Sequence, residues 1–276
     1  MTSQHACSIP QRLVDRFAIT TASLVFRSNA ARVWRVRLAS GECAALKLYA
    51  DPRMGNEAAG WQYIARAGAL TVDIMDQTGG AILMGWLDGP SLGDLAREGA
   101  PEQADRVLAD MAQQLTAAAI SPADLLPLSQ LLAPLERMQT KERALAEALT
   151  IYRYMQSHMQ NSAGSYAGLN TALHGDLHHD NIRSHAGRWR AFDAKGLQGP
   201  AAYELANAFR HPRGMTTYAS QPATIMRRLD LWSAALDVSR TDLAQWGAVK
   251  IALSCAWRGK SDPFDLRVLD QLLGHA

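Results

Sequence analysis

The chain is poor in cysteine. Its 276 residues include three cysteines, Cys7, Cys43 and Cys255, which are widely spaced and form no C-x-x-C pair. An odd number of scattered cysteines is not the pattern of a disulfide framework and suits a reducing compartment. We therefore expect all three to be free thiols.

The sequence also lacks a long apolar run and a strong excess of either charge. No stretch approaches eighteen uninterrupted apolar residues, and the first residues, MTSQHACSIPQRLVDRF, lack the basic start and apolar block of a secretion signal. The 28 Lys and Arg against 26 Asp and Glu leave a formal net charge of +2, and no basic run is interleaved with aromatics. We expect a cytoplasmic protein that binds neither membrane nor nucleic acid.

What the chain does have is enough apolar content, 48%, for one large domain or two modest lobes. Residues 23–49 alternate apolar and polar side chains in three runs, with a turn at Ser40-Gly41, which predicts a three-stranded antiparallel meander. Helical spacing predicts a helix over about 54–67 that ends at Gly68. Two further strands are predicted over 71–76 and 81–86.

The pattern changes after the loop at 87–90. Residues 91–160 are rich in Ala, Leu, Gln and Glu at helical spacing. We expect the helical part to be interrupted only around HGDLHHDN, residues 174–181, and by a hairpin over 182–192. The predicted fold class is α+β: a small antiparallel-sheet lobe over 1–86 and a larger, mainly helical lobe over 87–276, with a ligand cleft between them.

The segment HGDLHHDN is the densest group of reactive side chains, and it allows more than one chemistry. His174 and His178 are four residues apart, as two ligands on one helix face would be, and His179, Asp176 and Asp180 could add donors for a transition metal. A polar loop with only a structural role is a second interpretation.

A third interpretation uses oxygen ligands. Asp176 precedes Asn181 by five residues, and the predicted hairpin returns the chain so that Asp193 lies beside Asn181. Asn181 and Asp193 would then hold Mg²⁺, while Asp176 would accept the proton of a hydroxyl group. This arrangement favours phosphoryl transfer of the kinase type.

The pattern H-G-D-L-H-x-x-N at 174–181, followed by D-x-K-G at 193–196, resembles the aminoglycoside phosphotransferase-like kinases. The segments FDAKGL (192–197), AYELAN (202–207) and ALSCAW (252–257) are most similar to the streptomycin 6-phosphotransferase and hydroxyurea kinase branch. The resemblance implies a protein kinase-like fold, Mg²⁺, ATP or GTP as donor, and an aminoglycoside or aminocyclitol such as streptomycin as acceptor. A kinase of another hydroxylated metabolite, a nucleotide-binding pseudokinase and a metal-dependent hydrolase are the alternatives.

A kinase also needs a cation on its third strand, and Lys47 lies in the apolar run AALKLY. Glu57, on the predicted helix that follows, is its expected ion-pair partner. The alternative is an edge-strand lysine and a solvated glutamate. By resemblance, Met84 lies at the back of the adenine pocket, and the Gly85 carbonyl and Leu87 amide face the base.

Several positions depart from the family pattern. The loop between the first two strands, residues 28–32, contains no glycine and cannot be the G-x-G-x-x-G hairpin of protein kinases. Ala194 and Pro200 stand where the branch usually has Pro and Asp. Asp180 stands in place of a small residue, and we expect it to be a solvated turn residue. His174 and His178 are expected to order the loop through hydrogen bonds to backbone or carboxylate groups.

Overall fold

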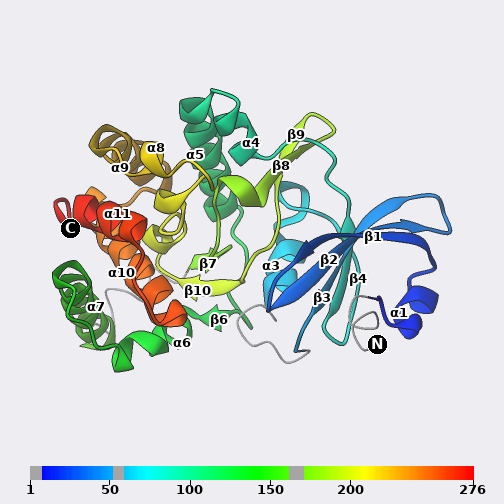
Figure 1. Ribbon diagram of the computed structural model, residues 1–276, viewed down its shortest axis with the longest axis horizontal. Helices are drawn as coiled ribbons and strands as arrows, with labels where there is room; N and C mark the ends of the chain where they lie inside the picture. The colour runs from blue at the N-terminus through cyan, green and yellow to red at the C-terminus, as the bar shows by residue number, and fades with distance from the viewer. Residues whose placement is uncertain (1–7, 52–58, 162–170) are drawn as a thin grey trace.

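Five strands form one sheet at the N-terminal end of the molecule. The computed structural model describes residues 8–51, 59–161 and 171–276. Its first sheet is antiparallel, in the order β1-β2-β3-β5-β4, and is seen at one end of Figure 1. The strands are β1 (Ile19–Arg27), β2 (Ala31–Leu38), β3 (Cys43–Tyr49), β4 (Ile74–Thr78) and β5 (Ala81–Gly85). The predicted meander and the two later strands are confirmed, with β4 starting three residues later than predicted.

Alternation gives this sheet two different faces. Trp34, Val36 and Leu46 pack on one face against α1 (Gln11–Arg16), whose Leu13 is buried there with Phe17. The other face adds buried side chains, among them Ile82 and Met84, to the core shared with the helical lobe. The second face therefore forms one wall of the space between the lobes.

The helix α3 (Gly60–Ala67) follows the meander. It buries Tyr63 and Ile64, and ends at Gly68 with φ +58°, as the sequence predicted. Residues 54–58 of the predicted helix lie outside the described residues. Its first residue comes very close to the helical lobe: a Cβ atom added to Gly60 would lie 1.9 Å from the carbonyl oxygen of Ala194. Only glycine fits at this main-chain contact.

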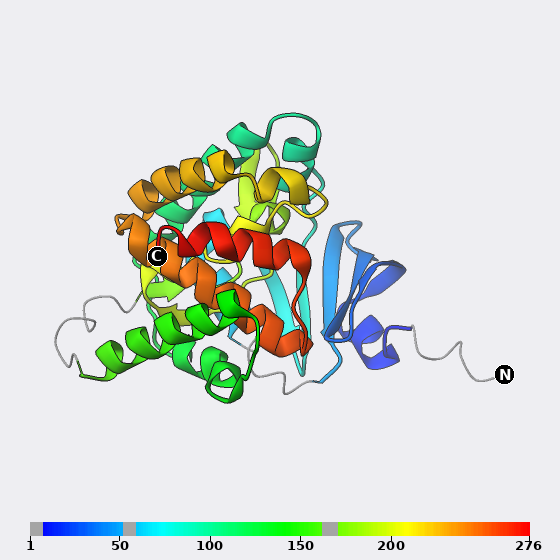
Figure 2. The ribbon, with the colours of Figure 1, turned by 60° about the vertical axis from the view of Figure 1, so that its left-hand side comes forward.

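The second lobe is mainly helical and is built around α10. Ser239 caps the first turn of α10 by accepting a 2.9 Å hydrogen bond from the amide of Asp242, and Gly259 ends the helix in the left-handed conformation. Helix α10 packs against α7, α9 and α11, as Figure 2 shows. The helices are α4 (Leu92–Arg97), α5 (Pro101–Ala117), α6 (Leu128–Leu132), α7 (Arg143–Asn161), α8 (Thr216–Ala219), α9 (Pro222–Leu236), α10 (Arg240–Arg258) and α11 (Pro263–Leu273).

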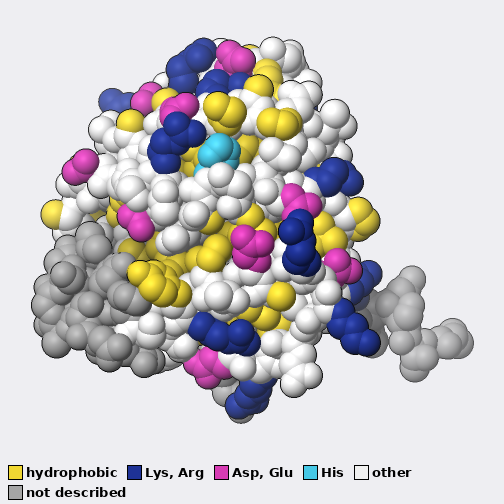
Figure 3. All heavy atoms as spheres, turned by 90° about the vertical axis from the view of Figure 1, so that its left-hand side faces the viewer, with side chains coloured by type: hydrophobic (Ala, Val, Ile, Leu, Met, Phe, Trp, Pro, Cys, Tyr) yellow, Lys and Arg dark blue, Asp and Glu magenta, His cyan; other side chains and the backbone are white. Residues whose placement is uncertain are grey.

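Short 3₁₀ turns connect these elements. They are η2 (Gly68–Leu70), η3 (Ala133–Arg137), η5 (His179–Asn181), η6 (Ala201–Tyr203) and η7 (Ala208–Arg210). Within the described ranges, no helix is long and apolar enough to cross a membrane. On the face of the helical lobe in Figure 3, basic and acidic side chains are interspersed.

A second small sheet in the helical lobe was not predicted. It consists of β6 (Leu126–Pro127), β7 (Thr171–Leu173) and β10 (Leu197–Gly199), in the order β6-β10-β7. The expectation that only residues 174–181 and the hairpin interrupt the helices is therefore wrong. Strands of two or three residues are too short to show alternation. Strand β7 directly precedes residues 174–196 and β10 directly follows them. The pairing of these two strands therefore holds the two ends of that segment together.

The predicted hairpin is confirmed as β8 (Ile182–His185) and β9 (Arg188–Ala191). The first sheet ends at Gly85 and α4 begins at Leu92. The predicted lobe boundary between residues 86 and 87 falls in the segment that connects β5 to α4, and we propose it as the boundary of the two lobes.

Candidate active site

The β8–β9 hairpin brings two predicted metal ligands together. Its register pairs Ile182 with Ala191, and the amide of Phe192 donates a 3.0 Å hydrogen bond to the carbonyl of Asn181. Asn181 therefore lies opposite the Phe192–Asp193 segment, as the spacing in the sequence predicted. The side-chain amide of Asn181 donates a 3.0 Å bond to the carbonyl of Asp176, which fixes that amide and leaves its oxygen available to a cation.

Asp176 lies in a largely buried, positively charged setting. Its Oδ1 accepts a 2.7 Å hydrogen bond from the side-chain amide of Asn207, and its Oδ2 lies 3.7 Å from the ammonium of Lys195. Burial would raise the pKa of Asp176, but the charges of Lys195 and other nearby cations outweigh it and hold that pKa below its usual range. The group is therefore an anion at neutral pH, as a proton acceptor must be.

Two of the three histidines order this loop. The Nδ1 atom of His174 accepts a 3.3 Å hydrogen bond from the amide of Asp176. Its Nε2 donates a 3.0 Å hydrogen bond to the carbonyl of Phe192. Burial lowers the pKa of His174 to about 4, so the ring is neutral. His178 accepts a 3.2 Å bond from the amide of Asp180. The expected ordering role of His174 and His178 is confirmed.

His179 anchors the loop to two helices. Its Nε2 lies 2.9 Å from Oδ1 of Asp105 in α5, and Nη2 of Arg228 in α9 lies 2.8 Å from the same oxygen. All three side chains are at most 1% exposed. The segment 174–181 is thereby attached to the core of the helical lobe.

The geometry of the histidines does not suit a transition-metal site. In the described part of the chain, one trio of potential ligands has its atoms within 4.8 Å of one another: His178, Asp180 and His211. The rings of His178 and His211 are stacked, with centroids 3.6 Å apart and planes 12° apart. Ring-nitrogen lone pairs lie in the ring plane, so two parallel stacked rings cannot both point at one ion. His174 and His179 lie outside the trio.

Lys47 in β3 meets this site at Asp193. It is 8% exposed, contacts the carboxylate of Asp193, and has its ammonium 4.6 Å from the ring centroid of Tyr49. The edge-strand alternative is wrong, because β3 lies between β2 and β5. Glu57 lies outside the described residues.

A cavity of about 480 Å³ opens between the lobes and unites most of the predicted residues. Lys47, Asn181 and Asp193 are among the residues that line it, together with Met84, Gly85 and Leu87. The amide of Leu87 makes no hydrogen bond to a described residue, so it is available to a ligand. The cavity is lined by Val25, Phe26, Ser28, Ala30, Ala31, Val33, Ala45, Lys47, Val72, Met84, Gly85, Trp86, Leu87, Asp180, Asn181, Arg183, Phe192, Asp193 and Arg213.

Sequence reasoning missed the cations and the amide around Asp176. Lys250 in α10 is 2% exposed, and burial lowers its pKa to about 7, while the charge of Asp176 opposes that shift. A lysine in the middle of the apolar run 243–256 was the available signal. Glu204 accepts 3.1 Å bonds from the amides of His174 and Gly175, and burial raises its pKa to about 7. Both Asn207 and Glu204 lie in the AYELAN segment of the family resemblance, which gave no contact with Asp176 or its loop for either residue.

The expectation for Asp180 is wrong. Its side chain is 16% exposed and accepts hydrogen bonds from Arg97, His211 and the amide of Arg213. Donors from α4 and from residues 211–213 surround a carboxylate that we expected to face solvent.

Comparison with known proteins identifies the family. Residues 16–261 match the model of the aminoglycoside/hydroxyurea antibiotic resistance kinases. The chain belongs to this family. A streptomycin 3''-kinase of Klebsiella pneumoniae is 29% identical over 231 residues, which cover 81% of this chain and 83% of that protein. The expected ATP-dependent phosphotransferase acting on hydroxyl groups is confirmed.

Solved structures share the fold of this kinase at low identity. A ternary complex of a thermostable aminoglycoside phosphotransferase APH(4)-Ia with ADP and hygromycin B has a TM-score of 0.62 at 14% identity and covers 96% of this chain and 98% of that chain. A choline/ethanolamine kinase family protein from Mesorhizobium loti has a TM-score of 0.63 at 12% identity, with 96% and 89% covered. The expected protein kinase-like fold is confirmed.

Proposed function

We propose that this kinase transfers the γ-phosphate of ATP or GTP to a hydroxyl group of an aminoglycoside or aminocyclitol, with streptomycin as the first candidate. The observation that carries the proposal is the anionic Asp176, held by Asn207 and Lys195 in the same short loop as Asn181. The family and its streptomycin-phosphorylating relative support the acceptor class.

In the proposed reaction Asp176 orients the acceptor hydroxyl and takes its proton. The hydroxyl oxygen forms a bond to the γ-phosphorus as the bond from that phosphorus to the β–γ bridging oxygen breaks, and the nucleoside diphosphate leaves. Asp176 suits this role because Lys195 and Asn207 leave its carboxylate ionised and fixed in direction.

The oxygen donors near the cavity fit Mg²⁺. Asn181 and Asp193 would hold the ion, which neutralises phosphate charge when bound. Lys47 would bind the donor phosphates, and Met84, Gly85 and Leu87 would enclose the base, because all four line the same cavity. Glu57 remains the proposed partner of Lys47.

A kinase of another hydroxylated metabolite is the second candidate, and one observation favours it. Lys195 lies 3.7 Å from Asp176, and the buried Lys250 interacts with the same carboxylate. A polycationic acceptor bound beside Asp176 would be repelled by the ammonium of Lys195, and by Lys250 where it is protonated, whereas a neutral acceptor would not be repelled. The complete set Lys47, Asp176, Asn181 and Asp193 speaks against a pseudokinase.

The test is a panel of hydroxylated antibiotics and metabolites incubated with Mg·ATP or Mg·GTP, followed by mass spectrometry. A phosphate adduct on streptomycin, together with streptomycin resistance of cells that express the protein, would support the first candidate. Fragmentation of the adduct would give the hydroxyl, and cell fractionation would test the proposed cytoplasmic location. An adduct only on neutral metabolites would favour the second candidate, and no adduct on any compound would count against both.

A further inference from the structure

Asp180 holds a neighbouring loop in place. Its Oδ1 accepts a 3.0 Å bond from Nη1 of Arg97, and its Oδ2 accepts a 2.8 Å bond from Nδ1 of His211. Gly93 in α4 leaves the necessary room, because a Cβ atom there would lie 2.2 Å from Oδ1 of Asp180. Asp180 and Arg97 together are called the Asp180–Arg97 anchor below, because they tie α4 and residues 211–213 to the 174–181 loop.

The backbone of Arg213 is fixed on both sides by this anchor. Its amide donates a 3.0 Å bond to Oδ2 of Asp180, and its carbonyl accepts a 2.9 Å bond from Nη1 of Arg97. Arg97 is itself held by a 2.8 Å bond to Asp94. The main chain of an exposed loop residue is thus restrained by two charged side chains.

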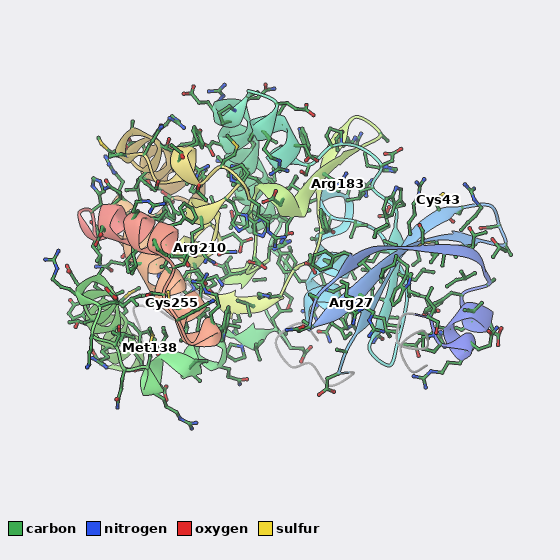
Figure 4. All side chains as sticks on the ribbon, viewed as in Figure 1. Arg27, Cys43, Met138, Arg183, Arg210 and Cys255 are labelled. Carbon is green, nitrogen blue, oxygen red and sulfur yellow. The ribbon has the colours of Figure 1, made fainter. Side chains whose placement is uncertain are left out.

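The side chain of Arg213 has no partner of its own in the described part of the chain. It is exposed and lines the same cavity as Asn181 and Asp193. The other two cations that line this cavity are engaged: Lys47 contacts Asp193, and Nε of Arg183, on β8 in Figure 4, donates a 3.0 Å bond to the carbonyl of Gly89. A guanidinium on a restrained backbone, with its donors unused, is prepared to bind an anion.

The loop between β1 and β2, which also lines the cavity, has two of its amides already occupied. In the glycine-free loop between β1 and β2, Oγ of Ser28 accepts bonds of 3.2 Å and 3.1 Å from the amides of Ala30 and Ala31. Those two amides are occupied and cannot also bind phosphate. A second cation beside Lys47 would therefore help this cavity to bind the phosphates of a donor nucleotide.

We propose that Arg213 is a phosphate-binding residue for the donor nucleotide, presented to the cavity by the Asp180–Arg97 anchor. The inference rests on the proposed function, because it assumes that the cavity binds a nucleoside triphosphate. It gives Asp180, one of the departures from the family pattern, a role in nucleotide binding that it exerts through Arg213.

The test measures binding of Mg·AMP-PNP and of adenosine by calorimetry to wild type, Arg213→Ala and Arg213→Lys. Loss of a charge-assisted bond to phosphate should weaken AMP-PNP about 10- to 100-fold in Arg213→Ala. Adenosine, which has no phosphate, should bind Arg213→Ala with the same affinity as wild type. Arg213→Lys should have an affinity for AMP-PNP between those of Arg213→Ala and wild type. Arg188→Ala, at the exposed end of the β8–β9 hairpin, is the matched control and should change neither affinity.

The anchor is tested by a double-mutant cycle. Arg97→Met removes the hydrogen bond to the Arg213 carbonyl. This substitution should weaken AMP-PNP binding in the wild-type background but not in the Arg213→Ala background. Thermal melting of each variant without ligand shows whether it is folded.

Three results would overturn the inference. If Arg213→Ala binds AMP-PNP like wild type, Arg213 binds no phosphate, and the proposed function is unaffected. If AMP-PNP and adenosine are weakened equally, the residue only shapes the base or sugar site. If wild type binds no nucleotide at all, both the inference and the proposed function fail.

Discussion

The side-chain amide of Asn207 donates a 2.7 Å hydrogen bond to Asp176, and its oxygen accepts from Arg210. Arg210 lies beside α10 and α11 in Figure 4, where it pairs with Asp265, and Asp265 also contacts Arg258. The proposed base is therefore oriented by a chain of polar side chains that extends through the helical lobe to α11.

Asn207 should act as a positioning residue. We expect Asn207→Ala to lower kcat roughly 10-fold or more, because a hydrogen bond to a charged group is lost, while KM for the nucleotide stays near wild type. Asn207→Asp would place a second carboxylate beside Asp176 and raise the pKa of the base, so the rising limb of the kcat–pH profile should move to higher pH. An unchanged profile and kcat in both variants would rule out this role.

The two aspartates should separate chemistry from nucleotide binding. Asp176→Asn should reduce kcat by roughly 10²–10⁴-fold with Mg·nucleotide affinity near wild type, because only the proton acceptor is lost. Asp193→Asn should weaken Mg²⁺-dependent nucleotide binding as well as turnover. Calorimetry with a non-hydrolysable nucleotide, with and without Mg²⁺, measures both. The reverse pattern would mean that the two roles are exchanged.

The buried contact between Asp105 and Arg228 should dominate the stability of the helical lobe. Asp105→Asn would leave the Arg228 guanidinium without its counter-charge, and we expect the free energy of unfolding to fall by about 3–5 kcal/mol. Urea unfolding measures this change. Asp110→Asn, on the exposed face of the same helix, is the matched control and should stay within about 0.5 kcal/mol of wild type. A similar small effect for Asp105→Asn would contradict the prediction.

Lys250 should make stability depend on pH above neutrality. Its pKa is lowered from 10.5 to about 7 by burial, so the folded state favours the neutral amine. Titration of Lys250 should therefore make the free energy of unfolding rise between about pH 7 and pH 10.5. Below pH 7 the free-energy cost of burying the charged lysine should be largest. We expect Lys250→Met to have a higher Tm than wild type at pH 7, by a margin that shrinks toward pH 10. Lys260→Met, at an exposed lysine, should show no such pH-dependent difference. A margin that does not change with pH would exclude this explanation.

The two lobes and the meeting of Asn181 with the Asp193 segment could be predicted because local patterns specify them. Alternation marks the strands, and a short hairpin fixes which residues lie opposite each other. Asp180 could not be predicted in this way. Its partners Arg97 and His211 are 83 and 31 residues distant in the chain, and no local pattern records such contacts.

The strands β6, β7 and β10 escaped prediction for a different reason. They hold together through main-chain hydrogen bonds between segments distant in sequence, and their two or three residues carry no periodicity. Lys250 could have been recognised, since a lysine inside a largely apolar helical run requires an explanation. Its location near Asp176 depends on how α10 packs, which only the tertiary structure reveals.

The contact between Gly60 and Ala194 joins main chain to main chain, one residue from Asp193. Apart from glycine itself, such a contact places no demand on side-chain identity. Substitutions elsewhere in the helical lobe can therefore change which acceptors are accommodated without altering how α3 meets the segment that carries Asp193. In this fold, acceptor range and donor geometry can therefore change separately, as long as position 60 remains glycine.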